Sequence, residues 1–266
     1  MTKIKGIDVS YHNGTIEWNK VKRDVDFVMI RAGYGRGNID KKFHEYSIGC
    51  EKNGIPYGYY WFSYAYTPEM AVAEADYCCD AIACFSPTYP IVFDFEYGSI
   101  NYAKSHGYNL KPADVVAICR AFLDRVEERG YYAMFYSNDD FLEHYGLKEL
   151  IDRYALWIAK WSNNPPTYNY GIWQYGTGRV NGIEGNVDLD TSRKNYHQII
   201  SSLYDFGNER KMQVALGMSN EWWNKYVLIA KRAIVGIYND FEVTQICAKN
   251  GMDENIVRKV MDILYA

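Results

Sequence analysis

The segment Pro90–Glu96, PIVFDFE, constrains the fold more than any other part of the sequence. Its apolar residues are β-branched or aromatic, which is typical of a short strand buried on both faces. Residues i and i+2 of a strand point to the same side, so Asp94 and Glu96 share one face, with Cα atoms about 7 Å apart. Two acids there are costly unless they are paired or perform chemistry. Because α/β barrels carry their active sites at the carboxyl ends of the strands, we favour catalysis over a structural salt bridge or loop cap.

Strand-like and helix-like segments alternate through most of the chain. Apolar runs predict eight strands, at residues 3–9, 27–32, 57–64, 90–96, 132–137, 155–161, 171–175 and 186–189. Amphipathic or capped segments predict helices at 16–23, 42–53, 68–83 and 112–129. The fold class is therefore predicted to be α/β. We expect an irregular, parallel TIM-like barrel with about five β/α units plus three closely spaced strands.

Four acids fall at or near the ends of predicted strands, namely Asp8, Asp94, Glu96 and Asp188. The carboxyl ends of parallel barrel strands converge on one concave face, here called the bowl. We therefore expect these four carboxyl groups to meet in the bowl. Three neighbouring acids are interpreted as structural: Asp26, Asp40 and Asp190.

Composition and charge exclude several classes of function. The net charge is −4 and no basic patch is apparent, so nucleic acid is not an expected partner. No apolar run approaches the length of a membrane span, and Met1–Ser10 does not resemble a signal peptide, so we expect synthesis in the cytoplasm. The six cysteines and five histidines match no metal-binding spacing, so neither a metal nor a cofactor is predicted. The 26 tyrosines and 7 tryptophans suit a sugar-binding surface as well as a core.

The last third of the chain has a different pattern. From about Ile199 it is helical, and five residues recur with an offset of 34: Ile200, Tyr204, Gly217, Met218 and Lys225 return as Ile234, Tyr238, Gly251, Met252 and Lys259. A period of this size indicates stacked copies of a small helical unit, although a chance echo between amphipathic helices is the alternative. The predicted domains are a barrel at 1–195 and an all-α module at 199–266, with repeats at about 199–230 and 231–266.

Several motifs along the barrel segment resemble the family 25 glycoside hydrolases, the N-acetylmuramidase lysozymes. They are KGIDVS at 5–10, FVMIRAGYG at 27–35, GYYWFSYA at 58–65, VFDFE at 92–96, FYSN at 135–138, LWIAKW at 156–161, IWQYG at 172–176 and GNVDLD at 185–190. The resemblance runs from about residue 3 to 192, in order and at matching spacing. It implies an irregular barrel of eight strands with few helices. It also implies cleavage of the β-1,4 bond between N-acetylmuramic acid and N-acetylglucosamine in peptidoglycan glycan strands.

The resemblance also implies roles for individual residues. Glu96 matches the general acid and Asp94 its partner acid, while Asp8 and Asp188 match the other two acids of the bowl. Six residues lie where the family contacts sugar: Tyr60, Tyr64, Tyr136, Trp161, Trp173 and Gln174. The second carboxyl role stays open. Asp94 could orient the 2-acetamido group of the substrate as nucleophile, which we favour, or Asp188 or Asp8 could activate water.

Two rival interpretations use the same strand. Chitinases of family 18 carry D-x-x-D-x-D-x-E, but Tyr89 and Val92 stand at the two earlier acidic positions here. A non-catalytic wall-binding protein on the same barrel is the other rival. It would have no need of four acids, so we favour the enzyme.

The tail resembles the short helical cell-wall-binding repeats of family 7, which are attached to phage lysins. This resemblance implies a cell-wall ligand, although exposed Trp222 and Trp223 would equally suit contacts between helices or subunits. We expect a phage endolysin that reaches the wall through a holin pore or on lysis. A bacterial autolysin of the same activity is the alternative, and the sequence predicts no oligomeric state.

Overall fold

A computed structural model of the chain describes residues 3–203, 218, 220–234 and 238–265. The chain divides into two compact units, and each is described by itself. The first contains residues 1–81 and 87–198, and the second contains residues 82–86 and 199–266.

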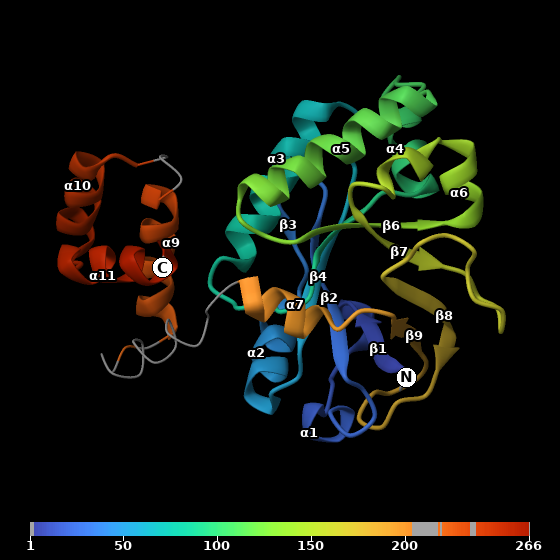
Figure 1. The fold of residues 1–266 in the computed structure, drawn as a ribbon, viewed down its shortest axis with the longest axis horizontal. Coiled ribbons are helices and arrows are strands. Elements are labelled where there is room, and N and C mark those ends of the chain that lie inside the picture. The colour runs from blue at the N-terminus through green and yellow to red at the C-terminus, as the bar shows by residue number, and fades with distance from the viewer. Residues whose placement is uncertain (1–2, 204–217, 219, 235–237, 266) are drawn as a thin grey trace. The chain divides into compact units, whose positions relative to one another are not determined.

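The first unit is built on a closed barrel of eight strands (Figure 1). The strands are β1 (Ile4–Val9), β2 (Phe27–Tyr34), β4 (Tyr57–Phe62), β5 (Ile91–Asp94), β6 (Ala133–Asn138), β7 (Ala155–Ala159), β8 (Ile172–Gly178) and β9 (Val187–Ser192). Their order is β1-β9-β8-β7-β6-β5-β4-β2, and pairing of β1 with β2 closes the ring. The short strand β3 (Asn38–Ile39) forms a hairpin with β2. The predicted fold class and all eight predicted strands are confirmed.

Strand β9 corrects the expectation of a wholly parallel barrel. It runs antiparallel to both of its neighbours, β8 and β1, whereas the other pairs around the ring are parallel. The physical reason is the connection 179–186, which is too short for a crossover between parallel strands. As a consequence, the first residues of β9, not its last, lie at the bowl.

The four predicted helices are present with slightly shifted ends, as α1 (Trp18–Val21), α2 (Phe43–Asn53), α3 (Pro68–Ile82) and α5 (Pro112–Glu128). Further helical segments were not predicted: α4 (Tyr97–Ser105), α6 (Asp139–His144), the start of α7 (Tyr196–Leu203) and the 3-10 turns η1 (Tyr11–Asn13) and η2 (Leu147–Leu150). Helix α6 starts directly after a strand because the side chain of Asn138 caps it, accepting from the Phe141 N–H at 2.9 Å.

Alternation along the strands separates an inner from an outer set of side chains. Residues paired in register share a face, so the pairing of Asp94 with Tyr136 and of Asp8 with Met29 defines the inner face. On the outer face, Phe93 of β5 stacks on Phe122 of α5 with ring centroids 4.3 Å apart. This outer layer forms the core between the barrel and its helices.

The amino end of the barrel is filled by aromatic rings. Phe27 at the start of β2 is fully buried and stacks on Tyr89, with centroids 4.4 Å apart. Gly6 stands in register with Phe27, and a Cβ atom there would lie only 2.2 Å from the ring. A side chain at position 6 therefore has no room, because aromatic rings fill this end of the barrel.

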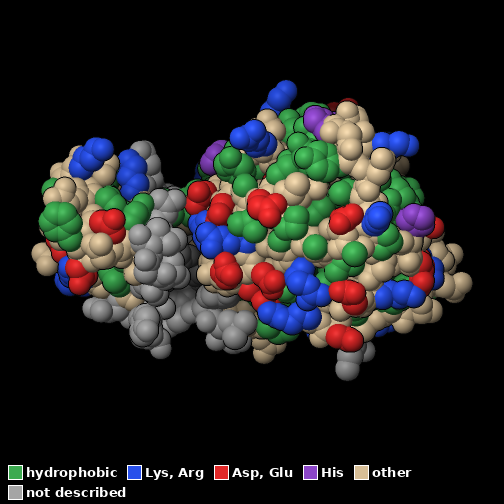
Figure 2. All heavy atoms as spheres, turned by 90° about the horizontal axis from the view of Figure 1, so that it is seen from above, with side chains coloured by type: hydrophobic (Ala, Val, Ile, Leu, Met, Phe, Trp, Pro, Cys, Tyr) green, Lys and Arg blue, Asp and Glu red, His purple; other side chains and the backbone are tan. Residues whose placement is uncertain are grey.

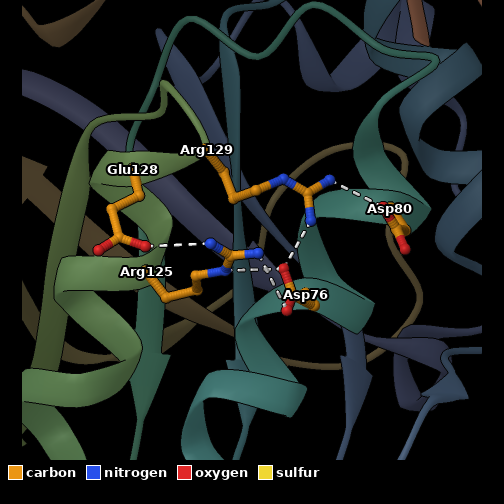
Figure 3. A network of polar contacts seen from close by, with 5 residues as sticks. All are labelled: Asp76, Asp80, Arg125, Glu128 and Arg129. Carbon is orange, nitrogen blue, oxygen red and sulfur yellow. Dashed lines mark hydrogen bonds and ion pairs between the residues drawn. The ribbon is translucent and has the colours of Figure 1, made fainter. Parts of the chain in front are cut away.

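An ion-pair network links α3 to α5 on the outside of the barrel (Figure 3). The Asp76 carboxylate accepts from Arg125 Nε at 2.9 Å and from Arg129 Nη1 at 2.7 Å, and Arg129 also contacts Asp80 at 2.7 Å. Bidentate and shared guanidinium contacts of this kind fix the relative position of two helices. Elsewhere, acidic and basic side chains are interspersed over the face seen in Figure 2.

The described part of the tail has its own apolar core. Helices α9 (Asn220–Ile234), α10 (Asp240–Asn250) and α11 (Glu254–Tyr265) bury ten hydrophobic residues: Trp223, Tyr226, Val227, Ile229, Ala230, Val243, Cys247, Met252, Val257 and Val260. The expectation that Trp223 is exposed is wrong, because it is 6% exposed, whereas Trp222 is 40% exposed. No helix in the described part of the chain is long and apolar enough to cross a bilayer.

The 34-residue repeat stays a prediction. In the second copy, Gly251 ends α10 in the left-handed conformation at φ 64° and Met252 is buried in the core. The first-copy residues Tyr204 and Gly217 lie outside the described residues.

Candidate active site

Asp94 and Glu96 stand together at the carboxyl end of β5. Asp94 is the last residue of β5 and is buried, while Glu96 is half-buried and leads into α4 with extended backbone (φ −132°, ψ −173°). Extended backbone at Glu96 keeps the two side chains on one side. The hydrogen bond between their carboxyl groups acts upward on the pKa of Asp94 and downward on the pKa of Glu96. Burial raises the pKa of Asp94 well above its ordinary value and also raises the pKa of Glu96.

A second pair of acids, Asp8 and Asp188, meets at the junction of β1 and β9. They are direct partners in the antiparallel ladder. Burial and the neighbouring Asp188 raise the pKa of Asp8 to about 7, and burial raises the pKa of Asp188. The Gln174 amide on β8 donates to Asp8 Oδ2 at 2.8 Å. The structure thus brings all four predicted acids to the bowl.

Asp190 belongs to the same cluster, although the sequence analysis assigned it a structural role. It is fully buried, hydrogen-bonds with Asp8 and accepts from Trp157 Nε1 at 2.8 Å. Burial raises the pKa of Asp190 well above its ordinary value. The sequence could have indicated this position, because residues 188 and 190 of one strand lie on the same face.

Asp40 and Asp26 have contacts that suit the structural roles expected of them. Asp40 accepts from Arg31 Nε and from the Lys42 N–H, both at 2.8 Å, and Asp26 accepts from the Lys5 N–H at 2.8 Å. These contacts hold loops and strand ends in place.

Aromatic side chains form the walls of the bowl. Tyr60 pairs in register with Val92, and Tyr136 pairs with Asp94 and with Trp157, so the three aromatic side chains lie on the inner face. The Trp157 ring lies edge-on to Tyr60 and Tyr136, with ring centroids 6.0 and 5.1 Å away. Tyr136 donates to Gln174 Oε1 at 3.2 Å. Trp157 was not among the predicted residues, because its segment was interpreted only as a buried strand.

Two predicted sugar contacts lie on the rim. Trp161 follows β7, is 65% exposed and donates from Nε1 to Gln174 Oε1 at 3.2 Å. Tyr64 follows β4, and its ring packs against Tyr34 and Tyr102. For both rings, contact with sugar stays a prediction.

Trp173 is the predicted contact that the structure separates from the others. It pairs in register with Ile158 and Thr191, so it lies on the face opposite to its neighbour Gln174. It is 5% exposed and donates from Nε1 to the Lys160 carbonyl at 2.8 Å. Its position supports the rim segment that carries Trp161.

Arg31 is an inward-facing cation that the sequence analysis did not single out. It pairs in register with Tyr60 and bonds Asp40, while its Nη2 is buried without a hydrogen-bond partner in the described part of the chain. Its positive charge opposes the upward effect of burial on the pKa of Asp94. The apolar run FVMIRA concealed this residue, since one cation in a buried strand leaves no periodic signal.

The chemistry available here is acid catalysis beside a cation-stabilising cluster. Four carboxyl groups lie at the carboxyl end of the barrel and that of Asp190 lies one step deeper, in register with Gly6, and burial and mutual repulsion keep protons on some of them near neutral pH. A protonated carboxyl can protonate a leaving oxygen, and ionised neighbours can stabilise a developing positive charge. Aromatic walls with polar edges suit a sugar ring.

Comparison with known proteins agrees with this site. The chain is 27% identical over 194 residues to the autolytic lysozyme of Clostridium acetobutylicum, covering 70% of this chain and 55% of that protein. It is 28% identical over 198 residues to lysozyme M1 of Streptomyces globisporus, covering 70% of this chain and 66% of that protein. The chain thus spans only about half to two-thirds of the length of these relatives.

The chain is also similar to a solved structure of a peptidoglycan-binding autolysin. The modular autolysin LytC of Streptococcus pneumoniae, in complex with a synthetic peptidoglycan ligand, superposes with a TM-score of 0.61 at 29% identity, over 71% of this chain and 46% of that chain. The family described as glycosyl hydrolases family 25 matches residues 7–183, which include Asp8, Asp94 and Glu96. The chain belongs to glycosyl hydrolases family 25.

Proposed function

We propose that the barrel hydrolyses the β-1,4 bond between N-acetylmuramic acid and N-acetylglucosamine in peptidoglycan. The observation that carries this proposal is that Asp94 and Glu96 stand together at the carboxyl end of β5, with Asp8 and Asp188 paired at the junction of β1 and β9. The peptidoglycan-ligand complex of the pneumococcal autolysin and the two lysozyme relatives support the choice of substrate.

Glu96 is the proton donor in this proposal. It is half-buried and so is reachable from the bowl, whereas Asp94 is 7% exposed and lies behind it. Burial raises the pKa of Glu96, which favours the protonated form that a general acid needs. Tyr60 and Tyr136 line the space in which the sugar at the cleaved bond would lie.

Asp94 then acts on the 2-acetamido group of the substrate. Retaining glycosidases place acid and nucleophile about 5–5.5 Å apart and inverting enzymes about 6.5–9.5 Å, whereas Asp94 and Glu96 are in direct contact. No sugar carbon fits between two carboxyl groups at that separation. Asp94 is instead suited to orient the acetamido group, whose oxygen attacks the anomeric carbon, and water later opens this intermediate with net retention.

An inverting route is the second candidate. Asp8 and Asp188 are neighbours on the other side of the bowl, and either could activate water. The two routes differ in the anomer first released, which proton NMR of a fresh digest reads directly. Initial β-product supports substrate assistance, and initial α-product supports inversion.

Analysis of the digestion products tests the proposed activity. Purified cell walls are digested, reduced with borohydride and examined by mass spectrometry. Reduced N-acetylmuramic acid without new free amino groups supports the proposal. Reduced glucosamine ends would indicate a glucosaminidase, new amines an amidase or peptidase, and intact walls a non-catalytic wall-binding protein.

We further propose that the tail binds the cell wall and that the protein acts as a phage endolysin released by a holin or on lysis. The separate helical core of α9–α11 and the exposed Trp222 support a tethering module. A bacterial autolysin is the alternative setting. The full chain labelled with a fluorophore should decorate susceptible cells, and a chain ending at Leu203 should decorate them far less.

A further inference from the structure

A buried glutamate outside the bowl has contacts that the proposed reaction leaves unexplained. Glu74 lies on α3, behind the segment that follows β4, and is 3% exposed. Its Oε1 accepts from the Tyr64 N–H at 3.0 Å, and the Ser63 side chain opposes the upward effect of burial on the pKa of its carboxyl group. Oε2 is buried without a hydrogen-bond partner among the described residues. Burying a carboxyl group with one oxygen unpartnered costs free energy relative to an apolar side chain.

The segment held by Glu74 is bonded to the backbone of both acids. The Ser63 N–H donates to the Asp94 carbonyl at 2.8 Å. The Ser63 carbonyl accepts from the Ser99 hydroxyl at 2.6 Å, and Ser99 Oγ in turn accepts from the Glu96 N–H at 3.2 Å. Ser63 and Ser99 are both fully buried. An unbroken series of hydrogen bonds therefore runs from Glu74 to the two residues that carry the acid pair.

We propose that Glu74 is a positioning residue for the acid pair. By fixing Ser63 from behind, it sets the backbone at Asp94 directly and the backbone at Glu96 through Ser99. The inference rests on the proposed function, since it assigns a support to the same site. Glu74 has no contact with the acids of the bowl and reaches them only through the segment of Ser63 and Tyr64, so its effect on them is one of geometry.

The rate of proton transfer depends strongly on the distance between the groups. A displacement of about 1 Å in a catalytic group can lower the rate on the order of 100-fold. The Ser63 hydroxyl also accepts from the Ala65 N–H at 3.0 Å. Without the carboxyl group, the Tyr64 N–H is left buried and unpaired, which favours rearrangement of the segment.

Steady-state kinetics on soluble glycan chains released from peptidoglycan test the role. Glu74→Ala should lower kcat roughly 10–100-fold while KM changes less than about threefold. Glu74→Gln keeps an acceptor for the Tyr64 N–H and should restore kcat to within about threefold of the wild type. Asp76→Ala is the matched control, because it loosens the same helix through Arg125 and Arg129 without contacting Ser63 (Figure 3). It should leave kcat of the folded protein unchanged.

A double-mutant cycle separates positioning from a general loss of stability. Ser99→Ala leaves Glu74 in place and interrupts the path before Glu96, and it should lower kcat roughly tenfold. The double variant Glu74→Ala/Ser99→Ala should lose no more than about threefold beyond the worse single variant, since both act through one path.

Several outcomes overturn the inference. They are multiplicative losses in the cycle, an unchanged kcat in Ser99→Ala, or an equal fall of kcat in Asp76→Ala. If Glu74→Ala does not fold, an unchanged kcat in Ser99→Ala still overturns the inference, because the path from Glu74 to Glu96 runs through Ser99. Failure of the proposed function is recognised separately, because then the wild-type protein itself releases no new muramic acid reducing ends.

Discussion

Replacing Glu74 with glutamine should change how the stability of the barrel depends on pH. Burial raises the pKa of Glu74 from 4.5 to about 7 in the folded protein. The native carboxyl group therefore keeps its proton at pH values where the unfolded chain has already lost it. Its contribution to stability is complete below pH 4.5 and is lost as the pH rises to about 7. At about 1.36 kcal/mol per pH unit, the loss amounts to about 3 kcal/mol.

Glutamine does not titrate, so this loss should be absent from Glu74→Gln. The free energy of unfolding, measured by urea titration at pH 4.5 and pH 7.5, should fall by about 3 kcal/mol more in the wild type than in the variant. In thermal scans this corresponds to roughly 6–12 °C for a unit of this size. All other titrating groups are common to both proteins and cancel in the difference.

The control is Glu17→Gln, at a glutamate whose side chain is 56% exposed. The free energy of unfolding of Glu17→Gln should change with pH as that of the wild type does. The reasoning would be refuted if Glu74→Gln also followed the wild type within about 0.5 kcal/mol, or if the wild type gained stability relative to it as the pH rose.

Four further predictions concern the site and the domain boundary. Glu96→Gln should lower wall lysis on the order of 1,000-fold with an unchanged circular dichroism spectrum, and near-normal activity would remove Glu96 from its role. Asp190→Leu should cost about 1–3 kcal/mol in urea unfolding because the Trp157 N–H loses its acceptor, whereas Asp190→Asn should cost much less; equal losses would contradict this account. A chain ending at Leu203 should keep activity on soluble glycan chains and lose activity on intact cells. A chain ending at Ser192 should be less stable, since it lacks the fully buried Tyr196 that packs against Tyr89 and Tyr132.

The strands were predictable because doubly buried strands are short, continuous apolar runs, as in IVFD of β5. The sequence predicts Asp188 at the bowl correctly but assigns its strand the wrong direction. Asp188 ends a predicted parallel strand, whereas in the structure it stands near the start of an antiparallel one. Strand direction depends on connection length and pairing partners, which a single strand's composition does not encode.

The parts of the site that were missed depend on long-range pairing. Trp157 and Asp190 are 33 positions apart in the sequence and meet only because β7, β8 and β9 are neighbours. Strand alternation alone would have placed Trp173 and Gln174 on opposite faces, yet both were expected to contact sugar. Helix α4 was missed because its start follows the acid pair directly and its sequence, YGSINYAKS, has little amphipathic character.

The aromatic filling at the amino end makes the barrel a blind cup rather than a tunnel. Phe27 and Tyr89 close the floor, and Gly6 leaves no space beside them. A polymer cannot be threaded through such a cup and must be laid sideways across its mouth. On the proposed function, a glycan strand would therefore be bound and cut at internal positions without a free end, and both fragments would leave by the side from which the strand arrived.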